Sequence, residues 1–415
     1  MTTEPQAIRT RASRRARALA PTAGLVVAVL LMAANLRPAV TGLGPVLDQV
    51  RDSLRASPAF LSVLTALPGL CFGLAGFLAP VLARRAGLGR ALAVSLGLLT
   101  VGLLGRVVDG PVVLLTGTFV ACAGIAICNV LLPVVIRESF PRRIGLLTGL
   151  YTAVLQGAAA LASVVTPALD SLLSGWRTAL AAWAVLAAIA LIGWLLAARP
   201  GPAPDPAVEE AADIAPAGDL PPVEARGRSL TRNKLAWAIT LFFGLQAMFA
   251  YSVMGWLAQV LMAAGVSREV SGVMLGTASL IGVPLSLVVT PIASRGRSQS
   301  VWLAGITATG VLGVLGLMLA PQAAPWLWTV LMGVGMGVFS LAVALISLRT
   351  ANAAETRSLS TMTQSVGYLL AAVGPLVFGM LHGLTGGWAG SLVFLLVGQA
   401  IQIVVGLVAG RDRFV

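Results

Sequence analysis

Histidine and cysteine are scarce in this sequence. The 415 residues contain one histidine, His382, and three cysteines, which lie in apolar stretches without the spacing typical of metal ligands or redox pairs. We therefore expect the cysteines to be small buried side chains, and we expect no metal site and no cofactor. An enzyme acting within a membrane would need facing acids, a histidine pair, or a serine beside a lysine or histidine. No such set is visible, so we do not expect an enzyme.

Charged residues are also few, and long apolar stretches take their place. Only 10% of the residues are charged and 58% are hydrophobic, while the mean hydropathy is +0.93. This composition indicates a polytopic membrane protein, because about 20 apolar residues are enough for a helix to cross the hydrocarbon core. We predict twelve spans, at residues 21–47, 58–83, 91–107, 111–136, 145–168, 178–197, 236–262, 270–293, 300–319, 326–348, 358–383 and 389–409.

The basic residues favour one orientation. If both termini are cytoplasmic, 22 of the 28 basic residues fall in the tails and the cytoplasmic loops, as the positive-inside rule requires. The formal net charge of +13 is then explained by topology, and we expect no nucleic-acid partner. The expected surroundings are a lipid bilayer, with contacts to anionic headgroups.

Residues 199–235 divide the chain in two. This segment is rich in proline and holds six of the fifteen acids, a composition typical of a disordered linker. We predict a basic cytoplasmic tail at 1–19, a six-helix bundle at 20–198, a cytoplasmic linker at 199–235, a second six-helix bundle at 236–410 and a short cytoplasmic tail at 411–415.

The two halves carry sparse internal matches at the same span number. A shift of 211 residues carries Asn35 onto Gln246, and a shift of 208 residues carries Gln156 onto Gln364. Two related bundles with a binding site between them are what transport by alternating access needs. The predicted fold is therefore an all-α membrane protein with twelve helices in two pseudo-symmetric six-helix bundles, acting as a monomer.

Four motifs resemble those of one group of carriers. They are NLRPAVTGLGPVLDQV in span one, NVLLPVVIRESFPRRIGLLTGLY across spans four and five, FFGLQAMFAYSVMGWL in span seven and LSTMTQSVGYLLAAVGPLVFGMLHGLTGGW in span eleven. In this order they are similar to the cyanate and 2-nitroimidazole transporter family of the major facilitator superfamily. The resemblance implies a bacterial inner-membrane carrier for small anions or nitroheterocycles. It departs at Arg84, which stands where the superfamily usually has an aspartate after span two, so that gate contact is not implied here.

Arg37 is a charged residue near the middle of the first span. A charge at the bilayer centre costs at least about 2.5 to 3.5 kcal/mol on insertion scales, and no acid lies within the spans to offset it. We interpret Arg37 as facing the cavity, where it is available to an anion or a polarised nitro or carbonyl group. The alternative is a structural role, bridging backbone carbonyls or span ends. Pro38 is expected to loosen the helix beside it.

Other candidates lie on polar helix faces. Gln156 belongs to a polar stripe in span five, and Gln364 and Tyr368 belong to one in span eleven. Such stripes line a cavity or bond a neighbouring helix. Asn35 points about 200° away from Arg37 on one helix, so we expect one of the two to pack instead. With Arg37, the predicted substrate-binding residues are Asn35, Asn129, Tyr151, Gln156, Gln246, Tyr251, Gln364 and Tyr368.

Acids at the inner ends of spans suggest a gate. Glu138 and Glu355 follow spans four and ten, within possible reach of Arg84, Arg85 and Arg295. We predict that these pairs latch the cytoplasmic side when the carrier faces outward; surface ion pairs without that role are the alternative.

The predicted function is secondary transport of a small solute by alternating access. The solute is expected to be a small anion or a nitroheterocycle-like compound. A multidrug-type exporter of neutral or weakly charged compounds is the alternative within transport, and a membrane sensor or receptor is the alternative from another class. Coupling is open at this point: the carrier is a facilitator, or Asp48 takes a proton at the cavity mouth, or the substrate itself brings the charge.

Overall fold

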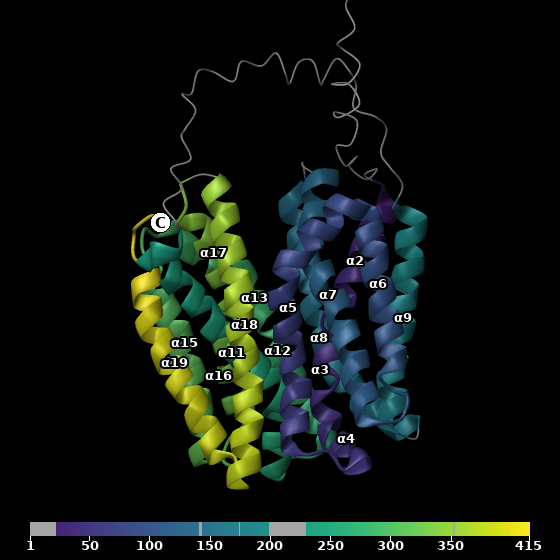
Figure 1. Ribbon diagram of the computed structural model, residues 1–415. Helices are drawn as coiled ribbons and strands as arrows, with labels where there is room; N and C mark the ends of the chain where they lie inside the picture. The colour runs from purple at the N-terminus through teal and green to yellow at the C-terminus, as the bar shows by residue number, and fades with distance from the viewer. Residues whose placement is uncertain (1–21, 141–142, 174, 199–229, 352) are drawn as a thin grey trace, which may run out of the picture.

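Long helices standing side by side make up the molecule (Figure 1). The computed structural model describes residues 22–140, 143–173, 175–198, 230–351 and 353–415. Twelve helical segments in these ranges are long and apolar enough to cross a membrane, which confirms the predicted number. The predicted tail at 1–19 and residues 199–229 of the predicted linker lie outside the described residues. The seventh span begins at Lys234, inside the predicted linker.

The N-terminal half contains spans one to six. Span one is broken into four short pieces, and the other five spans are single helices. The elements are α2 (Ala23–Ala34), α3 (Pro38–Thr41), η1 (Gly44–Val46), α4 (Leu47–Leu54), α5 (Pro58–Ala86), α6 (Leu88–Gly105), α7 (Pro111–Ser139), α8 (Ile144–Leu172) and α9 (Trp176–Ala197).

The C-terminal half contains spans seven to twelve. Spans eight and ten are interrupted, the former by a short π-helix, η4. The elements are η3 (Leu230–Arg232), α11 (Lys234–Ala263), α12 (Arg268–Leu280), α13 (Gly282–Pro284), η4 (Leu285–Val289), α14 (Thr290–Arg295), α15 (Ser300–Leu319), α16 (Pro325–Met336), α17 (Phe339–Leu348), α18 (Ala353–Thr385) and α19 (Ala389–Ala409).

Several helices begin at capping residues that the sequence supplies. The Ser57 side chain accepts a hydrogen bond from the Phe60 amide, and Pro58 takes the first helical position of α5, where its missing N–H costs nothing. Asn233 caps α11 in the same way. Between α5 and α6 the chain turns at Gly87, whose φ of +81° favours glycine.

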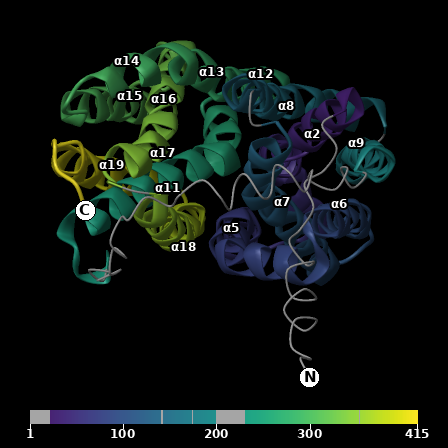
Figure 2. The same ribbon diagram turned by 90° about the horizontal axis from the view of Figure 1, so that it is seen from above.

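The two halves lie side by side and pack through two helix pairs (Figure 2). α5 runs along α18, and α8 runs along α12. Small residues allow this close approach: a side chain on Gly69 would come within 2.9 Å of the Ala372 Cα, and one on Gly276 within 3.0 Å of the Ala160 oxygen. We call the end where α2 begins and the chain ends the terminal face, and the end that carries α4 the far face (Figure 1).

Arg349 fastens the end of the chain at the terminal face. It is 3% exposed, donates to the carbonyl oxygens of Arg297 and Gly410 and contacts the Gln299 side chain. Burial lowers the pKa of the Arg349 guanidinium, and the nearby Asp412 carboxylate opposes that shift. The C-terminal half is therefore closed at this end by a buried arginine that bonds mainly to the backbone.

Candidate functional site

The first membrane span is interrupted beside Arg37. α2 ends at Ala34, and the turn α3 begins at Pro38. Arg37 has φ −124° and ψ −33°, outside helical geometry, because a proline disfavours the helical conformation in the residue before it. The expectation that Pro38 loosens this helix is confirmed.

The Arg37 side chain reaches across to the C-terminal half. Its Nη1 donates a hydrogen bond to the Tyr251 hydroxyl at 3.3 Å, and its guanidinium carbon lies 5.8 Å from the centre of the Tyr251 ring. The Nε atom is buried and has no partner. Within the described ranges, no ion pair joins Arg37 to a carboxylate. No acid among the residues that the structure describes therefore neutralises this charge.

Arg37 lines two adjoining cavities between the halves. The larger has a volume of about 580 Å³. Its walls come mainly from the parts of α5, α7, α8, α17 and α18 nearer the terminal face, with Gly282, Ser286 and Met336 of spans eight and ten. The smaller, of about 50 Å³, lies beside Tyr251. Gln156 and Tyr368 line both. The hollow thus extends from Arg37 toward the terminal face.

Aromatic rings stand next to Arg37. The Phe72 ring centre lies 5.3 Å from that of Tyr368 and 6.1 Å from that of Tyr251, and the two tyrosine rings are 6.3 Å apart. Phe72 comes from α5 in the N-terminal half, and the tyrosines come from α11 and α18. We call these three rings the aromatic wall. Together with Arg37 they offer flat apolar surface and one positive charge.

Seven of the nine predicted substrate-binding residues line these cavities. Six line the larger one, namely Arg37, Asn129, Tyr151, Gln156, Gln364 and Tyr368, and Tyr251 lines the smaller. The two glutamines related by the internal repeat both line the hollow, but the amide group of each already donates one hydrogen bond within the protein. Gln156 donates to the Ser279 carbonyl at 3.0 Å, and Gln364 donates to the Ser360 hydroxyl at 2.7 Å.

Asn35 and Gln246, the other repeat-related pair, lie outside the cavities. Asn35 is 4% exposed and donates to the carbonyls of Leu31 and Leu186. Gln246 is fully buried and donates to the Met336 carbonyl at 2.7 Å. Both amides therefore satisfy backbone groups at the breaks of spans one and ten. Of Asn35 and Arg37, Asn35 is the one that packs.

Charged and polar contacts close the far face. Arg268 of α12 reaches Asp48 at 2.5 Å and Asp170 at 3.7 Å, both in the N-terminal half. Gln259 donates to the Gly44 carbonyl at 3.1 Å, again across the halves. Asp48, predicted at the cavity mouth, thus lies in an ion pair on the closed side and lines neither cavity beside Arg37.

Comparison with known proteins decides the family. The sequence profile of the Major Facilitator Superfamily matches residues 25–375. This chain belongs to the major facilitator superfamily. The 2-nitroimidazole transporter of Escherichia coli (strain K12) is 34% identical over 390 residues, which span 94% of this chain and 96% of that protein. The cyanate transport protein CynX of the same strain is 27% identical over 366 residues, spanning 88% and 91%.

Solved structures agree with the fold of this superfamily member. A bacterial homologue of the human lysosomal transporter Spinster superposes with a TM-score of 0.75, over 94% of this chain and 98% of that one. At 16% sequence identity this likeness concerns the fold alone. The resemblance seen in the four motifs and the predicted fold class are both confirmed.

The predicted gate residues of this superfamily member lie at the terminal face. Arg84 and Arg85 stand in the last turn of α5, and Arg295 ends α14. Glu138 makes no ion pair with any other described residue, and Glu355 accepts a hydrogen bond from the Ala351 amide. The predicted latch belongs to the outward-facing state, so it stays a prediction.

Sequence reasoning missed Phe72 and the ion-pair partner Arg268. Phe72 sits in a uniformly apolar run, and only packing across the halves reveals its place in the aromatic wall. Arg268 looks like an ordinary loop residue in the sequence, although a basic residue between spans seven and eight is an exception to the charge distribution that predicts the orientation.

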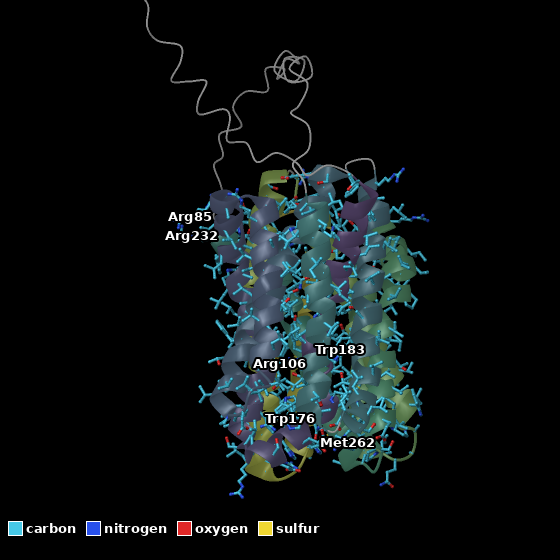
Figure 3. The ribbon with its side chains drawn as sticks, turned by 90° about the vertical axis from the view of Figure 1, so that its right-hand side faces the viewer. Arg85, Arg106, Trp176, Trp183, Arg232 and Met262 are labelled. Carbon is cyan, nitrogen blue, oxygen red and sulfur yellow. The ribbon has the colours of Figure 1, made fainter. Side chains whose placement is uncertain are left out.

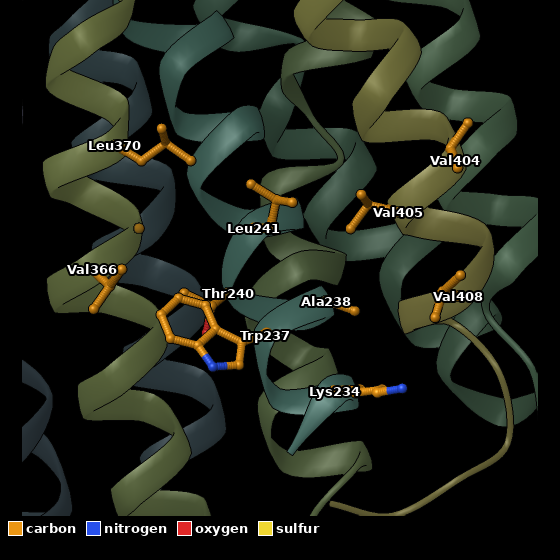
Figure 4. A pocket seen from close by; sticks show the side chains of 11 residues that line it. Lys234, Trp237, Ala238, Thr240, Leu241, Val366, Leu370, Val404, Val405 and Val408 are labelled. Atoms are coloured by element: carbon orange, nitrogen blue, oxygen red, sulfur yellow. The ribbon is translucent and has the colours of Figure 1, made fainter. Parts of the chain in front are cut away.

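A separate pocket of about 330 Å³ lies within the C-terminal half, between α11, α18 and α19. Its lining is almost entirely apolar, with Lys234 at one end (Figure 4). None of the predicted substrate-binding residues lines it, so the site around Arg37 is the candidate for solute binding.

Proposed function

We propose that this chain is a secondary transporter for small planar solutes that carry an anionic or strongly polarised group. The solute stacks on the aromatic wall while its charged group bonds to Arg37. One observation carries the proposal: Arg37 lines both central cavities with a buried, unpartnered Nε, and no acid in the described part of the chain forms an ion pair with it. An unpaired buried guanidinium is costly, and a bound anion would offset that cost.

The named relatives support the same solute class. Cyanate is a small anion, and 2-nitroimidazole is a flat ring with a polarised nitro group; the respective relatives carry these solutes by name. The site suits both chemistries, since a guanidinium binds carboxylate-like groups through paired donors and aromatic rings favour flat partners.

We infer that the terminal face is cytoplasmic, in a bacterial inner membrane. The basic residues favour this orientation, because Arg84, Arg85 and most of the other described arginines at the ends of spans lie on that side. The hollow then opens to the cytoplasm and the closed far face is extracellular, which is an inward-facing state. A monomer is sufficient, since both walls of the site come from one chain.

We also infer a carrier rather than an enzyme, and we favour coupling through the charge of the substrate. Asp48, the other coupling candidate, is paired with Arg268 and lines neither of the two cavities beside Arg37. A solute that brings its own negative charge meets the positive charge of Arg37 directly.

Solute exchange in proteoliposomes tests the proposal. Benzoate and benzamide are matched planar solutes that differ mainly in charge, and radiolabelled forms of both can be followed beside cyanate and 2-nitroimidazole. We expect the wild-type protein to exchange benzoate faster than benzamide at equal concentration. In the variant R37Q the rate of benzoate exchange should fall about 10- to 100-fold, which corresponds to the loss of one hydrogen bond to a charged group. The rate of benzamide exchange should change little.

A matched control is R177Q, which removes a partly exposed arginine paired with the exposed Asp109 within the N-terminal half. It should exchange both solutes at the wild-type rate. Equal losses for benzoate and benzamide in R37Q would contradict direct binding of the anion by Arg37. No exchange of any of the four solutes by the wild-type protein would contradict the solute class.

A further inference from the structure

Arg106, at the end of α6, is a second buried arginine in the N-terminal half. It is fully buried and lies in the part of the molecule nearer the far face (Figure 3). Its Nη1 donates to the Ala39 carbonyl at 3.0 Å and its Nη2 to the Leu180 carbonyl at 3.5 Å. Among the described residues no carboxylate pairs with it. Burying a guanidinium whose only partners are carbonyl oxygens costs free energy. We therefore expect the two contacts of Arg106 to matter for the structure around them.

The first of these contacts holds the turn that carries Arg37. Ala39 lies in α3, the four-residue turn for which Arg37 is the N-cap. The Arg37 carbonyl accepts hydrogen bonds from the amides of Val40 and Thr41 in that turn. The last carbonyls of a helix have no partner within it, and Arg106 supplies a donor to one of them. A shift of α3 would therefore move Arg37.

Other contacts fix the same segment to the N-terminal half. The Thr41 hydroxyl donates to the Ala159 carbonyl of α8 at 3.0 Å, and Asn35 donates to the Leu186 carbonyl of α9 before the break. Arg106 adds the tie to α6 and, through Leu180, to α9. Hydrogen bonds with α6, α8 and α9 of the N-terminal half thus hold the backbone around Arg37 in place. The Arg37 side chain bonds to Tyr251 of the other half.

We propose that Arg106 is a positioning residue for the substrate site. It holds the α3 turn so that the Arg37 guanidinium stays in the cavity, and it thereby sets the preference of the carrier for anions over neutral solutes. Arg106 itself lines neither cavity, so it acts through Arg37. The inference rests on the proposed function of Arg37.

A double-mutant cycle tests this role. Benzoate and benzamide exchange are measured for the wild-type protein, R106Q, R37Q and the double variant in proteoliposomes. We expect R106Q to lower kcat/KM for benzoate by about 10- to 100-fold, chiefly through KM, since misplacement of a binding group by 1 Å can cost that much. The kcat/KM for benzamide exchange should change less than about threefold, because a neutral solute does not depend on the position of the Arg37 charge. In the R37Q background, R106Q should add no further loss for benzoate.

The matched control is R349Q in the C-terminal half. It also removes a buried arginine that bonds backbone carbonyls, but far from Arg37, so it should lower thermal stability without changing the benzoate to benzamide ratio. If R106Q does not fold, R106K keeps the buried charge and one donor and should give a ratio between those of wild type and R37Q.

Two results would overturn the inference alone. The first is an equal loss of benzoate and benzamide exchange in R106Q or R106K. The second is a loss of benzoate exchange in the double variant that equals the sum, in free energy, of the losses in R106Q and R37Q. A wild-type protein without a preference for benzoate would contradict the proposed function, and this inference with it.

Discussion

At the scale of single residues, the site depends on how Arg37 is partnered. Among the described residues, the one hydrogen bond that the Arg37 side chain makes goes to the Tyr251 hydroxyl of the opposite half. The oxygen of a neutral phenol leaves the positive charge of the guanidinium available. A carboxylate in the same place would form an ion pair and compete with an anionic solute. The pairing of an arginine with a tyrosine thus orients the guanidinium without neutralising it.

Replacing Tyr251 by phenylalanine isolates this orienting contact. Y251F keeps the ring of the aromatic wall and removes only the hydrogen-bond acceptor. We expect the dissociation constant for benzoate to rise about 2- to 10-fold, the range of an ordinary hydrogen bond, and therefore less than in R37Q. Binding is measured by calorimetry on the purified protein. An effect as large as that of R37Q would mean that the hydroxyl itself contacts the solute.

At the scale of elements, breaks in membrane helices position the site. Spans one and ten are interrupted near the middle, and both breaks border the cavities through Arg37 and through Met336 and Phe339. Backbone groups freed within a membrane need partners. Asn35 donates to the Leu31 carbonyl at the first break, and Gln246 donates to the Met336 carbonyl at the second.

The buried amide at the second break should be structural. Q246L leaves the buried Met336 carbonyl without the Gln246 donor, which costs about 1 to 3 kcal/mol. It also removes one of the two acceptors of the Gln402 amide, which keeps the Thr307 hydroxyl. We expect thermal unfolding of the purified variant several degrees below wild type, with an unchanged dissociation constant for benzoate. Weaker benzoate binding at wild-type thermal stability would instead restore Gln246 to the substrate site, where the sequence alone had placed it.

The sequence predicts the elements better than it predicts which polar side chains face the cavity. Hydropathy predicts all twelve spans, and Pro38 predicts the break in span one. Both features depend on residues that are close together in the sequence. The break after Met336 has no proline; it faces Leu285 of span eight, which a side chain on Gly337 would contact at 2.6 Å. Asn35 and Gln246 are polar and related by the repeat, as Gln156 and Gln364 are. The sequence therefore does not distinguish the buried pair from the pair that lines the cavity, and only the packing of the helices does.

At the scale of the whole molecule, the far face is closed while the hollow extends toward the terminal face. Between described residues, the hydrogen bonds and ion pairs that join the halves lie at the middle of the molecule or toward the far face. Alternating access requires these to separate when the far face opens. Arg268 is central, since it reaches two acids of the other half.

Removing Arg268 should favour the state that is open at the far face. In R268Q the partly buried Asp48 and the buried Asp170 lose their cationic partner, which removes about 1 to 2 kcal/mol of stabilisation from the closed state. Spin labels at Asp52 and at Leu384, in opposite halves, should then show a larger population at long distance. The three native cysteines are buried and leave the introduced ones as the labelled sites.

R177Q is the control for that measurement. It breaks an arginine–aspartate pair of the same length within the N-terminal half, so it should leave the distance distribution unchanged. The same distribution in R268Q as in wild type would mean that the ion pairs of Arg268 do not hold the far face closed.

The central claim is that Arg37 supplies the charge that recognises the solute between the two halves. Calorimetric titration of the purified wild-type protein and of R37Q with benzoate, and then with benzamide, tests it most directly. We predict that the dissociation constant for benzoate rises at least about 10-fold in R37Q, while benzamide binds both proteins alike. Benzoate binding of equal strength to the two proteins would contradict the claim.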